Sequence, residues 1–182
     1  MTQILARLHQ EHVQISKLLD LLDDLLAMFH ARQEPDYEIL SELLQYMEDY
    51  SDQIHHPTEE VIRERLRLAG QNQPYLDVLT RQHEVLNEMT RNFRQAVEGV
   101  VNGEVQRRDQ VEAYGREMIA TLRAHLDLEE KEAFPLARQV LKEEDWAAIK
   151  AEVARTIDPR LSETDLQRIR AIVQHLTSQV RV

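Results

Sequence analysis

Two short segments of the sequence, HHPTEE at residues 55–60 and HLDLEE at residues 125–130, each contain a histidine followed four residues later by a glutamate. Side chains four residues apart lie one above the other on one face of an α-helix, so each pair can direct two ligands to the same point. The pairs are His55 with Glu59 and His125 with Glu129. A buried carboxylate needs a compensating charge, which a metal ion supplies. The two segments therefore predict a metal site inside a helical protein.

Apolar residues on both sides of these segments recur at spacings of three and four, the pattern of amphipathic helices. The pattern predicts an all-α protein with four long helices, over residues 1–33, 37–69, 76–102 and 105–140. Their short polar connections are typical of an up-down four-helix bundle, because they favour antiparallel neighbours. We expect residues 1–141 to form this bundle. Residues 142–182 should add two shorter helices on its outside, one from Glu143 to Thr156 and one beginning at Ser162.

A histidine falls at a similar height on the inner face of each long helix. His12, His83 and His125 stand in apolar stripes where leucine would be expected, and His55 lies among apolar residues of the second helix. With a rise of about 1.5 Å per residue, all four lie roughly 12–16 Å from the same end of the bundle. The spacing also repeats, with 43 residues from His12 to His55 and 42 from His83 to His125. The repeat predicts a two-metal site to which each half of the chain contributes one set of ligands.

The segment HHPTEE leaves two choices of ligand. Helical register favours His55 as the inward residue, because His56 shares a face with Glu60 and Arg63 that we expect to be solvated. Pro57 lacks a backbone donor and disfavours helical geometry at His56. A kink there could turn His56 and Glu60 inward in place of the pair that begins at His55.

Composition excludes several other classes of function. The absence of cysteine excludes disulfides, thiolate nucleophiles and Cys-ligated metal sites. A net charge of −11 disfavours binding to nucleic acid, and no basic amphipathic stretch indicates a membrane surface. No catalytic triad or phosphate-binding glycine-rich loop is evident. The N-terminus has no apolar signal-peptide core, so we expect a cytoplasmic protein.

At these residues the chain resembles the hemerythrin-like family, also called the HHE cation-binding domain. The resemblance covers roughly residues 1–141 and rests on HHPTEE, on HLDLEEKEAFP and on the order of the four histidines and two glutamates. It implies a non-haem site of two iron ions with an oxo or hydroxo bridge, in which manganese or zinc could replace iron. It also implies four terminal histidine ligands and two bridging glutamates, namely His12, His55, Glu59, His83, His125 and Glu129.

The chain departs from the family at Asn87, where oxygen-carrying members have a fifth histidine one turn after the third. Two octahedral ions offer about twelve positions, and the ligands above with one bridging oxygen fill about ten of them. About two positions remain for water or a diatomic molecule by this count. The departure at Asn87 therefore disfavours a simple reversible oxygen carrier without affecting the predicted metal site.

Three functions are compatible with the sequence. The first is a di-iron protein that binds or senses a small ligand, such as oxygen or nitric oxide, or that buffers iron. The second is an enzyme that activates oxygen or peroxide, although no substrate pocket or substrate motif is evident. The third is a metal-free helical interaction module with buried histidines. We expect the first, and the sequence identifies no protein partner.

Overall fold

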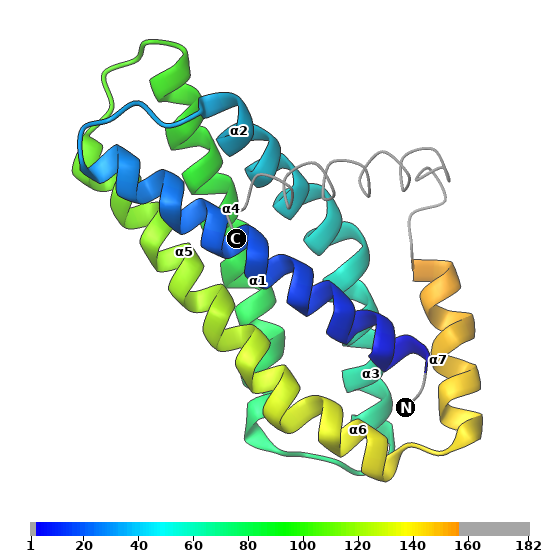
Figure 1. Ribbon diagram of the computed structural model, residues 1–182. Helices are drawn as coiled ribbons and strands as arrows, with labels where there is room; N and C mark the ends of the chain where they lie inside the picture. Colours follow the sequence, from blue (N-terminus) through cyan, green and yellow to red (C-terminus); the bar gives the residue numbers. More distant parts are fainter. Residues whose placement is uncertain (1–2, 157–182) are drawn as a thin grey trace.

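The computed structural model describes residues 3–156, and all the regular structure within them is helical (Figure 1). This confirms the all-α class. The elements, in chain order, are α1 (Gln3–His30), α2 (Tyr37–Tyr46), η1 (Met47–His55), α3 (His56–Leu68), α4 (Pro74–Val101), α5 (Arg108–Leu128), η2 (Glu129–Ala133), α6 (Phe134–Val140) and α7 (Glu143–Thr156). The segments η1 and η2 are π-helical. The further helix expected from Ser162 lies outside the described residues.

Four helical rods run side by side, namely α1, α2–η1–α3, α4 and α5–η2–α6, and the chain reverses direction between them (Figure 1). Local chemistry sets where the rods begin and end. The carboxylate of Asp36 caps α2 by accepting from the N–H groups of Glu38 and Ile39. Gly70 and Gly103 end α3 and α4 with positive φ angles of 79° and 74°, which glycine adopts without steric cost.

Two of the rods widen into a π-helical turn directly before a proline. The N–H of His56 donates to the carbonyl of Ser51, and the N–H of Phe134 donates to that of Glu129, in each case five residues back. The residues that follow, Pro57 and Pro135, have no N–H with which to continue an α-helical pattern. The continuous helices expected over 37–69 and 105–140 are therefore wrong in detail, since each is an α–π–α rod.

A polar layer divides the hydrophobic core into two clusters. One cluster includes Ile15 and Leu86, and the other includes Leu8 and Leu79. His12 follows Leu8 on α1 and His83 follows Leu79 on α4, so both histidines lie where the two clusters meet. The predicted ligand positions thus fall inside the bundle and away from its ends.

Helix α7 packs against the bundle near the end where the second cluster lies. Its Ile149 and Val153 are buried in that cluster with Leu66 of α3. The boundary predicted at residue 141 falls between α6 and α7, but the hydrophobic core continues across it. Among residues 3–156, none of the helices combines the length and apolar character needed to span a membrane.

Candidate metal centre

The polar layer contains five histidines and two glutamates, none more than 6% exposed. The structure brings together all six residues expected as ligands and adds one more, His56. The members of the layer are His12, His55, His56, Glu59, His83, His125 and Glu129. Each of the four rods contributes at least one of them.

The expectation that His56 and Arg63 face solvent is wrong, since both are buried. The cause is the π-helical turn, which adds a residue before α3 and rotates everything after it relative to a regular α-helix. His55 at the end of η1 and His56 at the start of α3 therefore both reach the interior. The irregular helix before Pro57 therefore does not replace His55 with His56, because both histidines are buried.

Inward-facing imidazole nitrogens form two close pairs. In the first pair, His12 and His55, the Nε2 atoms lie 3.1 Å apart. In the second pair, His83 and His125, they lie 3.0 Å apart. Two metal–nitrogen bonds of ~2.1 Å at a right angle end about 3.0 Å apart, so each pair fits neighbouring positions of one octahedral ion.

Glu59 joins the two pairs through its two carboxylate oxygens. Oε1 lies 3.2 Å from Nε2 of His12 and 3.1 Å from Nε2 of His55, whereas Oε2 lies 3.3 Å from Nε2 of His83. Two groups of possible ligands consequently share Glu59, one with the first pair and one with the second pair and His56. This is the arrangement expected of a carboxylate that bridges two ions.

Glu129 approaches the same space from η2. Its Oε2 lies 3.3 Å from Nε2 of His125 and 3.5 Å from Nε2 of His12, so it also faces one member of each pair. Its other oxygen accepts a hydrogen bond of 2.8 Å from Arg63. Glu129 therefore reaches both pairs but is partly engaged by a buried cation.

Each paired histidine is held from behind by an acceptor at its outer nitrogen. The Nδ1 atoms of the first pair lie 2.8 Å from Glu130 and Glu11, respectively. Those of the second pair lie 3.1 Å from Glu60 and Gln82. Carboxylate and amide oxygens only accept, so the Nδ1 atoms of His12, His55 and His125 carry the hydrogen and their Nε2 atoms can present a lone pair inward. Nδ1 of His83 also lies 2.8 Å from a guanidinium nitrogen of Arg63, which only donates, so Glu60 alone does not fix the tautomer of His83. Such outer partners are typical of metal-bound histidine.

These outer partners were not predicted from the sequence, although the internal repeat contains them. Glu11 and Gln82 directly precede the first histidine of each half, and each binds the histidine contributed by the next rod. Glu60 and Glu130 are the final residues of HHPTEE and HLDLEE, and each binds a histidine of the opposite half. Because these partners occupy matching positions in the two halves of the sequence, the internal repeat was the signal that could have revealed them.

The donor set fits a pair of cations. In each pair, two imidazole nitrogens lie about 3 Å apart beside buried carboxylates. Their lone pairs and the carboxylates repel one another unless protons or metal ions lie between them. Imidazole and carboxylate together suit iron, manganese and zinc, and no thiolate is present. Arg63, 2% exposed, is a fixed cation beside this set and offsets part of its charge through Glu129.

The metal-free layer has unequal proton affinities. Burial disfavours the charged form of His55, but Glu59 and Glu11 outweigh burial and raise its pKa to about 10. At His125 burial prevails and lowers the pKa to about 3. Burial likewise opposes ionisation of Glu59, yet the neighbouring histidines hold its pKa well below the usual value. Burial and the charge of Glu59 together raise the pKa of Glu129 well above its usual value.

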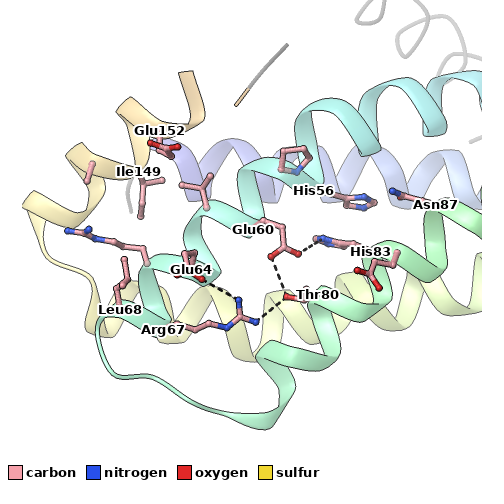
Figure 2. A pocket seen from close by; sticks show the side chains of 15 residues that line it. His56, Glu60, Glu64, Arg67, Leu68, Thr80, His83, Asn87, Ile149 and Glu152 are labelled. Atoms are coloured by element: carbon pink, nitrogen blue, oxygen red, sulfur yellow. Dashed lines mark hydrogen bonds and ion pairs between the residues drawn. The ribbon is translucent and has the colours of Figure 1, made fainter. Parts of the chain in front are cut away.

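A fifth imidazole reaches the layer although position 87 is asparagine. The ring of His56 stacks on that of His83 with centroids 4.0 Å apart and meets His125 edge-on at 5.8 Å. Asn87 and His56 both line a pocket that opens next to the second pair (Figure 2). The extra histidine therefore comes from α3, whereas α4 supplies it in the pattern of the oxygen carriers.

Fold and site together define a helical-bundle protein with a candidate two-metal centre built from histidine and glutamate. Comparison with known families gives the same class, since the model of the hemerythrin HHE cation-binding domain matches residues 3–137. The chain belongs to this family. No curated protein and no solved structure matches it.

Proposed function

We propose that this protein holds two metal ions, with iron the expected metal, and binds a small diatomic ligand such as oxygen or nitric oxide. The scaffold would be the up-down four-helix bundle of its family. The observation that carries the proposal is the position of Glu59, whose two oxygens face two pairs of imidazole nitrogens that are each held from behind. Such a donor set is typical of a dinuclear centre.

The geometry supports a division of the ligands between two positions. His12 and His55 would hold one ion, and His83 and His125 would hold the other. A ring nitrogen of His56 lies within 4.8 Å of the ligand atoms of Glu59, His83 and His125, so His56 would be a further nitrogen ligand at the second position. Glu59 and Glu129 would lie between the ions, as both carboxylates face one histidine or more of each pair.

The surrounding residues prepare the site for metal. Outer acceptors orient the imidazoles and keep Nε2 available, and the hydrophobic clusters on both sides exclude bulk water. Bound iron would supply a redox-active Lewis acid to which a small ligand can add. With His56 as a fifth imidazole, about one coordination position remains open, compared with about two if His56 does not coordinate.

Metal analysis combined with ligand titration tests this function. Protein purified from iron-replete cells without chelator should contain about two iron ions per chain. Nitric oxide added to the reduced protein should change its visible spectrum, and the doubly substituted variant His12→Leu, His125→Leu should lose both metal and response. Metal-free protein, or a variant that keeps two ions, would contradict the proposal. Two bound ions with no response to nitric oxide would indicate iron buffering in place of ligand binding.

A further inference from the structure

A pocket of about 810 Å³ lies between α3, α4 and α7 (Figure 2). Its long wall is the outward face of α3, α4 forms a second wall, and Ala148, Ile149 and Glu152 of α7 form the third. The sequence predicts the C-terminal extension only as two shorter helices on the outside of the bundle. The structure shows that α7 instead encloses a space beside the candidate metal centre.

The pocket meets the polar layer at two histidines. His56 and His83 belong to the layer and line the pocket. The other five members of the layer are at most 3% exposed. A metal ion that enters through this pocket would therefore arrive directly beside the second pair.

The lining of the pocket is acidic. It contains four glutamates and two arginines, and both arginines are already paired with aspartates. Arg65 donates to Asp145 at 2.8 Å, and Arg67 donates to Asp77 at 3.1 Å. Arg63 and Arg155 also pair with Glu60 and Glu152, at 2.8 and 3.2 Å, but acidic side chains still outnumber basic ones in this group. A concave surface with net negative charge concentrates cations and speeds their association.

Glu60 connects the pocket to the centre. It lines the pocket with a side chain that is 36% exposed, and its Oε1 lies 3.1 Å from Nδ1 of His83. Its Oε2 accepts a bond of 3.3 Å from Thr80, also at the pocket wall (Figure 2). Glu60 thus contacts a histidine of the layer from the wall of the pocket.

We propose that this pocket is the route by which divalent cations enter the centre, with Glu60 as the carboxylate that passes them to the second position. The inference rests on the proposed two-metal function and adds a path and a direction to it. Entry from one side means that the second position fills first and that the first position fills through it.

Stopped-flow mixing of metal-free protein with Co²⁺ tests the route, because visible bands of Co²⁺ report its coordination. Glu60→Gln keeps an oxygen acceptor for His83 but removes the charge, so uptake should slow by about tenfold. Glu130→Gln makes the same change behind His12, away from the pocket. Its effect should appear as faster release of metal, so the two variants separate entry from retention. Added salt should slow uptake by the wild type more than by Glu60→Gln.

A bulky residue placed in the pocket gives a second test that leaves the centre intact. Ala148 and Ala151 are both exposed on α7, but only Ala148 lines the pocket. Ala148→Trp should slow uptake by about tenfold without changing the final amount bound, whereas Ala151→Trp should behave as wild type. Two Co²⁺ ions bound at wild-type rates in both Glu60→Gln and Ala148→Trp would overturn the route while leaving the proposed function standing. Failure of wild-type protein to bind Co²⁺ at equilibrium would instead overturn the proposed function.

Discussion

The two halves of the chain place their histidine pairs alike but surround them differently. The Nε2 atoms are 3.1 Å apart in the first pair and 3.0 Å apart in the second. Behind the first pair both acceptors are carboxylates, Glu11 and Glu130, whereas behind the second pair one of them is the amide of Gln82. The ring of Phe134 stacks on His12 at 5.2 Å, while the second pair lies beside the pocket.

Matching positions of HHPTEE and HLDLEE account for much of this difference. The counterpart of His56 is Leu126, and the counterpart of Arg63, four residues after the glutamate, is Ala133. Both counterparts are buried among hydrophobic residues. Helix register thus sets where the ligands lie, and a few neighbouring side chains set the charge and access of each position.

Removing the charge of Glu59, the proposed shared ligand, should have the largest effect, because it affects both proposed positions at once. Glu59→Gln keeps the size of the side chain but removes the charge that faces both pairs. We expect metal content to fall from about two ions per chain to below one, measured by elemental analysis after dialysis. Glu130→Gln, which touches the first pair only, is the matched control and should keep more than one ion. Equal metal content in the two variants would mean that Glu59 does not join the positions.

Arg63→Met should have the next largest effect, and mainly in metal-free protein. The change leaves the carboxylate of Glu129 buried without its cation, at a cost of about 3 kcal/mol in the free energy of unfolding. Bound metal supplies positive charge in the same place, so the loss should be smaller in loaded protein. Urea unfolding of both forms measures the difference. Arg63→Met combined with Glu129→Gln should recover stability in the metal-free form, and equal losses in both forms would show that Arg63 acts through packing alone.

Regular helical periodicity was enough to predict that the four paired histidines are buried. Each of the four histidines stands in or beside an apolar stripe, so burial of that stripe places it in the core whatever the details of packing. Periodicity predicted the wrong face for His56 and Arg63, because the preceding segment is π-helical and does not have 3.6 residues per turn. Pro57 marked that segment, but a proline alone does not reveal how far the following residues rotate.

Outer partners and the pocket depend on how the rods pack together, which periodicity does not describe. Glu60 binds a histidine of α4, and Glu130 binds one of α1. From the sequence alone both are compatible with solvated charges. The pocket requires α7 to lie against α3, and the apolar residues Ile149 and Val153 that hold it there also suit other faces of the bundle.

Stability as a function of pH tests the electrostatic difference between the pairs in metal-free protein. The pKa of His55 is raised from 6.5 to about 10, so the folded protein holds more protons than the unfolded chain in that window, and the free energy of unfolding should fall as pH rises through it. The pKa of His125 is lowered from 6.5 to about 3, so the unfolded chain holds more protons there and stability should fall as pH drops. Stability should therefore be highest near pH 6.5, with losses of about 2 kcal/mol on each side.

Single substitutions assign the two limbs of that profile. His55→Leu should flatten the alkaline limb. His125→Leu should leave the alkaline limb and reduce the acid limb, part of which remains because the lowered pKa of Glu59 also contributes to it. Urea unfolding across the pH range measures both. A variant that flattens both limbs equally would show that the two pairs titrate as one unit and that their proton affinities do not differ.

His56→Leu should have the smallest effect and bears most directly on the comparison, because it gives HHPTEE the residue that HLDLEE has at the matching position, Leu126. The ring of His56 stacks on His83 and is grouped with the second pair, so its loss should weaken that position alone. A second-position affinity lower by about tenfold is expected, in line with loss of one supporting ligand among several. The affinity of the first position should be unchanged, since the group of candidate ligands His12, His55 and Glu59 does not include His56.

Calorimetric titration with Co²⁺ separates the two binding steps. Nitric oxide should react faster with the loaded variant, because the loss of His56 opens a coordination position. Weakening of both steps together would place His56 among the groups that hold the whole layer, whereas two unchanged steps would show that its ring only fills space beside the pocket.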